Sequence, residues 1–234
     1  MATFADSSVL VAGGTGGLGR AVTLAFLSAG ANVAVTYVVP GEYDTLRAAA
    51  GAASARLEGH AADVTDAAVA SGVIADIRAR RGRLDVLVNA VGGFAGGKPL
   101  WEADAAALDR MLALNLRSGW ALARAAAPVM LAMGRGAIVN VAAQAALVPP
   151  AGLGAYTASK AAAIALIASL AADLKGTGVR ANSILPSIID TPANRRSMPD
   201  ADFSKWPKPE EIARVVLFLC GDDAKLVNGA AIPV

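Results

Sequence analysis

The stretch Ser8-Val9-Leu10-Val11-Ala12-Gly13-Gly14-Thr15-Gly16-Gly17-Leu18-Gly19 decides the fold of this 234-residue chain. A short apolar run breaks into a glycine-rich turn, and a helical segment follows from Arg20 to Ala29, where Gly30 stops it. Glycines at a strand-to-helix turn let the backbone approach a pyrophosphate, and the helix N-terminus supplies amide donors and a positive dipole end. A tight turn alone would also use glycines, but the position after the first strand favours a dinucleotide site.

Short apolar runs alternate with longer helical patterns along the rest of the chain. We expect further strands at residues 32–39, 55–62, 85–89, 137–142, 179–185 and 230–234, and further helices at 42–53, 66–81, 105–133, 154–175 and 210–220. Strands that alternate with helices form a parallel sheet covered on both faces. The prediction is an α/β fold, a doubly wound parallel sheet of Rossmann type with about seven strands.

One polar, proline-bearing segment, residues 187–209, interrupts this alternation. It is too long for an ordinary connection in a compact domain, and such segments are usually lids or binding loops. No linker, repeat or low-complexity block divides the chain. We therefore expect a single domain over residues 1–234, with a lid or substrate loop at about 187–209.

Composition excludes several classes of protein. Hydrophobic residues make up 55% of the chain and charged residues 17%, and the net charge of +2 is dispersed, without a basic patch for nucleic acid. The single cysteine, Cys220, rules out an internal disulfide and suits a reducing compartment. Met1 to Ser8 lacks the pattern of a signal peptide, and no run of about 18 uncharged apolar residues predicts a membrane span. We expect a cytoplasmic protein that acts on a small molecule, without nucleic acid or membrane as a partner.

A tyrosine and a lysine lie four residues apart in Tyr156-Thr157-Ala158-Ser159-Lys160, at the start of the apolar run 161–172. Side chains at i and i+4 share one helical face. A fixed cation beside a phenol lowers its pKa from the reference value of about 10, which lets the phenol exchange a proton with a carbonyl oxygen. The same spacing also arises by chance in helices, so a catalytic interpretation of the pair depends on the other motifs of the chain.

Several motifs occur together in a fixed order. They are Ala12-Gly13-x3-Gly17-Leu18-Gly19, Asp63-Val64, Asn89-Ala90-Val91-Gly92, Asn115, Tyr156-x3-Lys160, and Pro186 with Thr191. In this order and spacing they resemble the short-chain dehydrogenase/reductase family, and the resemblance covers essentially the whole chain. It implies an oxidoreductase that transfers a hydride between a nicotinamide cofactor, NAD(P)(H), and its substrate.

The resemblance also implies roles for individual residues. Tyr156 would be the general acid/base, Lys160 would lower its pKa and bind the nicotinamide ribose, and Asn115 would hold a water that completes a proton relay. Cofactor contacts are implied for Gly13, Thr15, Gly16, Gly17, Leu18, Gly19, Tyr37, Asp63, Val64, Asn89, Ala90, Val91, Tyr156, Lys160, Pro186, Ile189 and Thr191. The structural alternatives are a helix cap for Asp63 or Asp66, a strand-end turn for Asn89, and a helix-start cap for Thr191.

The choice between NAD and NADP stays open at this point. An acidic residue at the end of the second strand binds the ribose hydroxyls of NAD, whereas a basic residue accepts the 2′-phosphate of NADP. This chain has Tyr37 and Val38 there. Glu42 is a more distant candidate for the ribose, and Arg20 is one for the phosphate.

The family's usual catalytic serine, thirteen residues before the tyrosine, is replaced by Ala143. That hydroxyl normally hydrogen-bonds the substrate oxygen, and loss of one such donor lowers a rate by about 10²–10³-fold. Three explanations compete: Gln144 substitutes for the serine, the substrate needs no such donor, or the protein is a weak or non-catalytic relative.

A local resemblance to dihydropteridine reductases supports the second explanation. Those family members keep the Tyr-x3-Lys motif, carry alanine in place of the serine, and have a C-terminal segment similar to residues 190–206. A quinonoid pterin or quinone accepts hydride into a conjugated ring. The candidate substrate contacts are Ala143, Gln144, Phe94 and Trp206.

Two further expectations concern metals and assembly. No cluster has metal-ligand spacing, so we expect no metal, and His60 is interpreted as structural. The resemblance implies a homodimer or homotetramer that pairs the two long helices, residues 105–133 and 154–175.

Overall fold

All strands of the single sheet run parallel, in the order β3-β2-β1-β4-β5-β6-β7, in the computed structural model, which describes residues 4–234. The strands are β1 Ser8–Ala12, β2 Asn32–Tyr37, β3 Leu57–Ala61, β4 Val86–Asn89, β5 Gly136–Val141, β6 Val179–Leu185 and β7 Ala231–Pro233. The doubly wound Rossmann-type sheet predicted from the sequence is confirmed. Residues 1–3, part of the segment predicted to lack a signal peptide, lie outside the described residues.

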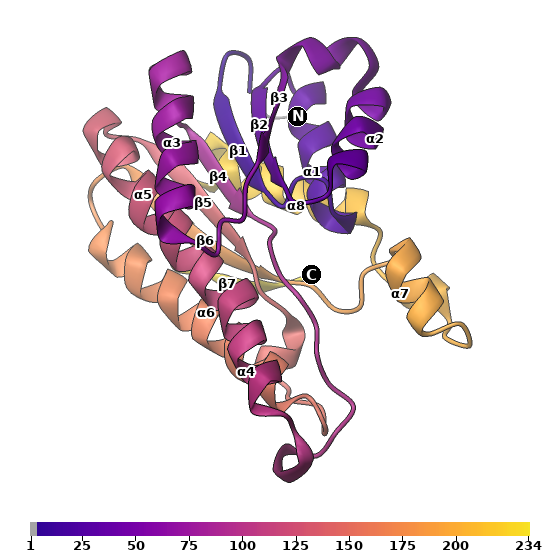
Figure 1. The fold of residues 1–234 in the computed structure, drawn as a ribbon. Helices are drawn as coiled ribbons and strands as arrows, with labels where there is room; N and C mark the ends of the chain where they lie inside the picture. Colours follow the sequence, from indigo (N-terminus) through magenta and orange to yellow (C-terminus); the bar gives the residue numbers. More distant parts are fainter. Residues whose placement is uncertain (1–3) are drawn as a thin grey trace.

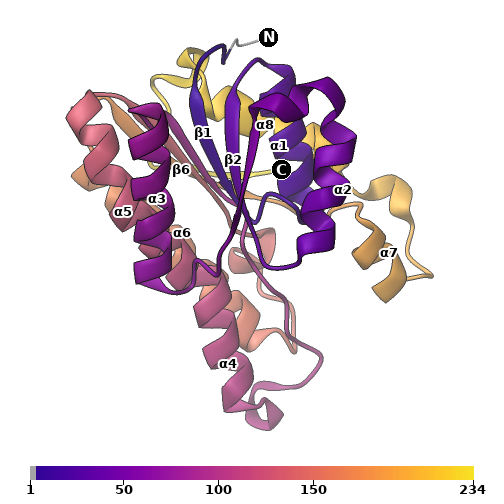
Figure 2. The same cartoon turned by 45° about the horizontal axis from the view of Figure 1, so that its top comes forward.

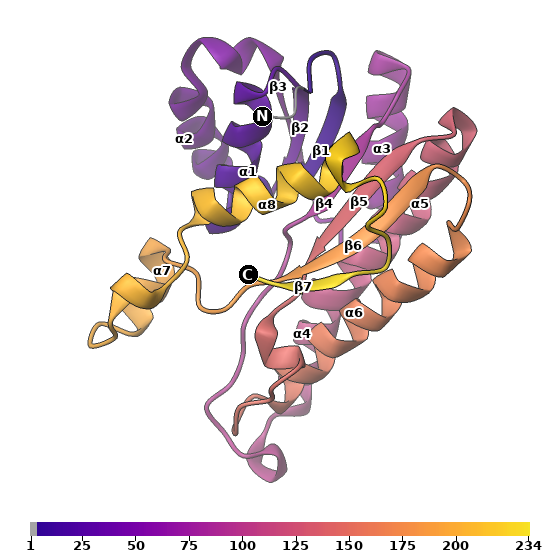
Figure 3. The ribbon, with the colours of Figure 1, turned by 180° about the vertical axis from the view of Figure 1, so that it is seen from behind.

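Helices cover both faces of this sheet (Figure 1). They are α1 Gly17–Ser28, α2 Pro40–Ala50, α3 Ala67–Arg81, α4 Ala105–Leu112, α5 Ser118–Met133, α6 Gly154–Asp173, α7 Pro192–Ser197 and α8 Pro209–Cys220. Seen from behind, α1 and α8 lie side by side on one face (Figure 3). The opposite face carries α3, α5 and α6.

Alternation along the strands explains these two layers. Val9 and Val11 of β1 pack in one buried cluster with α1 and α8, whereas Leu10 and Ala12 pack in another with α3, α5 and α6. Successive strand residues point to opposite faces, and a parallel sheet covered on both sides is apolar throughout. This is why the strand sequences are continuous apolar runs.

The strand order places the functional motifs at one edge. The chain moves from β1 outward to β2 and β3, and then crosses back to β4 on the other side of β1. The last residue of β1, Ala12, is in register with Thr36 of β2 and Asn89 of β4. Ligands of open α/β sheets bind outside the carboxyl ends of the strands at such a reversal. The glycine turn, Tyr37 and the loop after Asn89 therefore meet there.

The structure corrects the continuous helix expected over residues 105–133. Helix α4 ends at Leu112, a π-helical turn follows at Ala113–Arg117, and α5 begins at Ser118. A π turn inserts an extra residue and is common at functional sites. It contains Asn115, whose side chain is held by neighbouring elements, and a hydrophobic pattern does not encode this local widening.

The predicted lid also has more order than a loop. It contains α7 and a 3₁₀ turn at Phe203–Lys205, and α7 stands away from the sheet (Figure 2). Pro192 begins α7 and Thr191 caps it. A capping residue followed by proline at the first helical position is a helix-start pattern. The prediction of a lid rested on the length of the segment and did not use this pattern.

Among the described residues, one helix, α6, is long and apolar enough to cross a membrane by length and composition alone. This is weak evidence, since core helices of globular proteins meet the same criterion. Its Lys160 is only 5% exposed and packs toward the end of the sheet.

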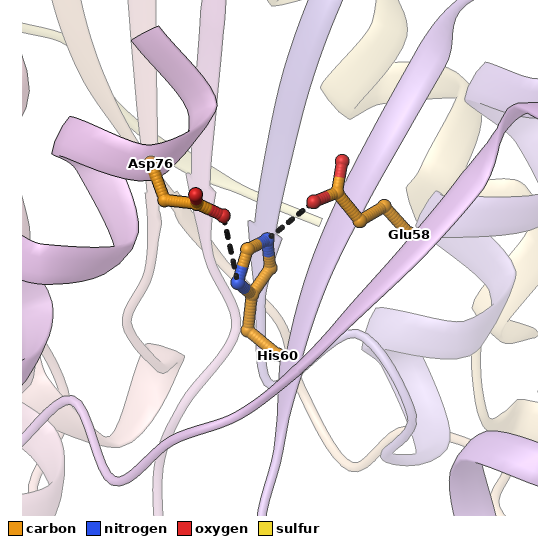
Figure 4. A group of neighbouring side chains, drawn as sticks. All are labelled: Glu58, His60 and Asp76. Carbon is orange, nitrogen blue, oxygen red and sulfur yellow. Dashed lines mark ion pairs between the residues drawn. The ribbon is translucent and has the colours of Figure 1, made fainter. Parts of the chain in front are cut away.

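His60 lies between two carboxylates, as Figure 4 shows. Its imidazole nitrogens are 3.4 Å from Glu58 of β3 and 3.8 Å from Asp76 of α3. The three groups could hold a metal ion by distance. Each carboxylate is also paired with an arginine, Glu58 with Arg81 and Asp76 with Arg80, both at 3.0 Å. Sequence spacing did not reveal this cluster. We interpret it as an ion-pair network that joins the edge strand to α3, and the structural role of His60 stays a prediction.

Candidate active site

The glycine turn after β1 is closed by close backbone contacts. The Gly13 amide donates to Thr36 Oγ1 at 3.1 Å, and the Gly16 amide donates to the Gly13 carbonyl at 3.2 Å. A Cβ atom at Gly19 would lie 2.1 Å from that carbonyl oxygen, and Gly13 has a φ of +69°. Because any larger residue would collide or be strained, glycines are required at both positions.

Helix α1 starts without a conventional cap. Its N-cap residue is Gly16, with no side-chain hydrogen bond, and its first turn has no acidic residue. The first amides of a helix lack intrahelical acceptors and carry the positive end of the dipole. The exposed Gly16 and Gly17, with Leu18 behind them, thus form a surface suited to a pyrophosphate.

Thr191, at the base of the lid, faces this turn. A Cβ atom at Gly17 would lie 2.8 Å from Thr191 Cγ2. Thr191 also accepts a hydrogen bond from the Asn194 amide at 3.2 Å, which is the capping alternative noted from the sequence. It therefore has a structural role and still lies where the family places a cofactor contact.

A groove of about 910 Å³ separates the glycine turn from the lid. Its lining combines Thr15, Gly16, Gly17 and Leu18 with Val39 and Glu42 near α2, and with Asp190, Thr191, Pro192 and Arg196 from the lid. The structure thus joins the first glycine motif to a segment far along the chain.

Asn89 orders the next loop through the strand-end turn that was the structural alternative for it, and its cofactor contact stays a prediction. Its side-chain amide donates to Asn140 Oδ1 at 2.9 Å, and its own Oδ1 accepts from the Val91 amide at 3.2 Å. The Ala90 amide donates to the carbonyl of Ala12, at the end of β1. These bonds hold residues 89–91 against the glycine turn.

The other predicted cofactor residues have local partners. Tyr37 stacks on Tyr43, with ring centroids 4.8 Å apart. Asp63 accepts from the amide and hydroxyl of Thr65 and precedes the buried Val64, and the helix cap that the sequence offered for Asp63 or Asp66 is made by Asp66. In the loop after β6, the carbonyls of Pro186 and Ile189 accept from Gln144 and Asn194. Their cofactor contacts remain predictions.

Lys160 and Asn115 converge on the loop after Asn89. Lys160 Nζ donates to the Val141 carbonyl at 2.9 Å. A Cβ atom at Gly92 would lie 2.9 Å from Asn115 Oδ1 and 3.2 Å from Lys160 Nζ. Tyr156 precedes Lys160 by one turn of α6. The residues predicted to form the catalytic group are thus brought together.

A hydrogen-bond chain links Asn115 to the backbone of Tyr156 through Ser159. The Asn115 amide donates to Ser159 Oγ at 2.9 Å, and this hydroxyl donates to the Tyr156 carbonyl at 2.7 Å. Asn115 also accepts from the Gly93 amide at 2.9 Å. Sequence reasoning missed Ser159, although it is a polar residue on an apolar helix inside the quoted motif.

Burial controls the protonation of this group. It lowers the pKa of Lys160 from 10.5 to about 8, and it raises the pKa of Tyr156 above its ordinary value. The net shift of the Tyr156 pKa is therefore upward, whereas the sequence predicted a lowered value, because burial prevails. The ammonium is bonded to the Val141 carbonyl, and removal of the phenol from water disfavours phenolate.

The buried Lys160 should make stability depend on pH. Its folded pKa, about 8, lies below the ordinary value of 10.5, so the unfolded chain binds more protons between these two values. The free energy of unfolding should rise through this window by about 3 kcal/mol relative to Lys160→Met. Urea unfolding at several pH values measures this rise. The exposed Lys175, replaced by methionine, is the control, and an equal slope for both variants would contradict the prediction.

Among the candidate substrate residues, Phe94 contacts the catalytic group. Its ring meets Tyr156 edge-on, with centroids 5.1 Å apart, and is 68% exposed. Ala143 lies just after β5 and is buried. Its methyl side chain offers no hydroxyl at the position where the family has its serine. Gln144 donates its side-chain amide to the Val234 carbonyl at 3.3 Å, and its role as a substitute donor stays a prediction. Trp206 packs on Phe203 in the lid.

Residues 7–202 match the family model of the short chain dehydrogenases. The chain belongs to this family and is an oxidoreductase of the short-chain dehydrogenase/reductase class.

Individual relatives support this assignment along almost the whole chain. The chain is 35% identical to 2-(S)-hydroxypropyl-CoM dehydrogenase 3 of Xanthobacter autotrophicus, with 97% of this chain and 94% of the relative covered. It is also 35% identical to D-threitol dehydrogenase of Mycolicibacterium smegmatis, with 94% and 88% covered. A short-chain type dehydrogenase/reductase from Mycobacterium ulcerans has the same fold, with a TM-score of 0.94, 27% identity, and 99% and 89% covered.

Proposed function

We propose that this protein is an NAD(P)-dependent oxidoreductase in which a hydride passes between the nicotinamide and a carbonyl or ring carbon, with Tyr156 as general acid/base. The observation that carries the proposal is the convergence of Lys160 Nζ and Asn115 Oδ1 on Gly92, one helical turn from Tyr156. The uncapped start of α1 and the glycine turn suit the dinucleotide.

The chain's own residues would handle the proton and the orientation of the reactants. The nicotinamide, when bound, supplies or accepts the hydride. Tyr156 gives a proton to the substrate oxygen in reduction and takes it back in oxidation. Lys160, whose pKa of about 8 leaves much of it charged near neutral pH, stabilises the phenolate that forms. Asn115 and Ser159 fix the helix that carries both groups.

Fluorescence titration with NADH and NADPH tests the cofactor part of this proposal. Binding of at least one dinucleotide is expected, and the Thr191→Ala variant should weaken it because Thr191 lies against Gly17. If neither dinucleotide binds, the proposed function is wrong.

Two substrate classes remain candidates. The named relatives are dehydrogenases of a hydroxypropyl compound and of threitol, which supports an alcohol–ketone pair. The buried Ala143 and the exposed Phe94 beside Tyr156 favour a conjugated ring, such as a quinonoid pterin or quinone, since a delocalised anion depends less on a second donor. A third possibility is a cofactor-binding relative with weak or no turnover, because Ala143 replaces the serine. An assay that compares quinonoid dihydropterin, quinones and ketones separates them.

We also propose a homo-oligomer formed through the layer of α5 and α6. Trp120 and Leu131 of α5 are 46% and 43% exposed, and only 28% of the apolar window in α6 is buried. Exposed large apolar side chains on neighbouring helices support an interface there.

Replacing Trp120 with glutamate should therefore shift the protein toward monomers, because a charge would be buried in the symmetric contact. Light scattering after gel filtration measures the mass. Phe218→Glu, an equally exposed aromatic on α8 of the opposite layer, is the control and should leave this pairing intact. A monomeric unmodified protein would contradict the proposal.

A further inference from the structure

The end of β2 lacks the residues that usually select the cofactor. Tyr37 stands at the strand end, and its ring lies parallel to that of Tyr43 at an interplanar angle of 5°. Val38 and Val39 follow and are 72% and 48% exposed. Neither a carboxylate nor a cation extends from the strand end itself, so selection depends on the next element.

That element, α2, begins at Pro40 and places Glu42 in its first turn. Thr15 of the glycine turn donates its hydroxyl to Glu42 Oε2 at 2.8 Å. The carboxylate therefore spans the gap between the turn that suits the pyrophosphate and the helix that follows β2. It also lines the groove that contains Gly16 and Gly17.

We propose that Glu42 selects NAD(H) against NADP(H), an inference that rests on the proposed function. A carboxylate accepts hydrogen bonds from the ribose hydroxyls of NAD, as the acidic residue after the second strand does in this fold. The extra phosphate of NADP carries nearly two negative charges and is repelled by the same group. Selection thus comes from attraction of one cofactor and repulsion of the other.

Cations also line this groove, and they support the alternative that the protein prefers NADP(H). Its charged residues are Arg20, Glu42, Asp190, Arg196, Lys208 and Glu210. Asp190 is paired with Arg195 of the lid. Of this set, Glu42 is the one with a side-chain hydrogen bond to the glycine turn among the described residues. A preference for NADP would require one of the cations, with the exposed Arg20 of α1 as the candidate from the sequence, to bind the 2′-phosphate.

Equilibrium binding tests the selection without any turnover. NADH and NADPH are titrated by fluorescence into the purified protein, and the melting temperature is measured with each. The unmodified protein should bind NADH at least about tenfold tighter than NADPH. Glu42→Gln should bring the two affinities together, and high salt should do so in the unmodified protein because it screens exposed charges. Glu210→Gln, another exposed first-turn glutamate of the same groove, is the control and should keep the preference.

The possible failures are distinct. Preference for NADPH that Arg20→Gln abolishes would assign the selection to Arg20 and overturn the role of Glu42. Equal binding of both cofactors, or a preference that Glu42→Gln leaves unchanged, would overturn the selection but not the oxidoreductase. Binding of neither would overturn both.

Discussion

Replacing Tyr156 with phenylalanine should lower the turnover number by about 10²–10⁴-fold, the usual contribution of a positioned general acid or base. The variant removes one hydroxyl and keeps the ring that packs edge-on against Phe94. Because Lys160 and Asn115 are held by Val141, Gly93 and Ser159 and not by the phenol, their positions should not change.

The loss should appear in the chemical step and not in cofactor affinity. NADH or NADPH titration and thermal unfolding should match the unmodified protein, while single-turnover hydride transfer slows. Tyr43→Phe is the matched control, since it removes a phenolic hydroxyl from a ring that stacks on Tyr37. Retention of full turnover by Tyr156→Phe would remove the central step of the proposed mechanism.

Replacing Ala143 with serine should raise kcat/KM on simple ketones by up to about 10²–10³-fold, the effect of a single donor to a developing oxyanion. Ala143 is the second residue after β5, has an extended backbone and is 7% exposed. A serine hydroxyl adds one atom there and supplies a hydrogen-bond donor at the position where the family has its serine.

The preceding residue provides the control for this gain. Ala142 is also buried, and its side chain alternates to the other side of the extended backbone, so Ala142→Ser should not activate ketone reduction. Activity on quinones and quinonoid pterins should change less than activity on ketones. No gain with any ketone would count against the missing donor as the limitation and favour a conjugated-ring substrate.

Much of the site was predictable because its parts are encoded locally. The glycine turn needs residues without a Cβ atom, which sequence shows directly, as Gly19 against the Gly13 carbonyl illustrates. Helix periodicity places Tyr156 and Lys160 on one face. The turn after Asn89 is also local, since its side chain accepts from the Val91 amide two residues further on. In contrast, the role of Ser159 depends on a partner 44 residues away.

The pKa shifts of Tyr156 and Lys160 and the π turn at Ala113–Arg117 depend on tertiary packing. Spacing predicts that a lysine beside a tyrosine lowers the phenol's pKa, but the balance of burial and charge depends on every neighbouring atom. In the structure burial prevails for both residues. The π turn at Asn115 interrupts what the apolar pattern predicted as one helix, because its side chain is held across to Gly93 and Ser159.

The sequence by itself determined the class of fold and the placement of Tyr156 and Lys160 on one face of a helix, since these depend on residue type, period and spacing. Only the tertiary structure decided that Glu42 reaches Thr15, that Thr191 lies against Gly17, and that Phe94 meets Tyr156. The physical reason is that each of these contacts joins elements distant along the chain. Their distances are set by the register of a parallel sheet and by the packing of the helices on it.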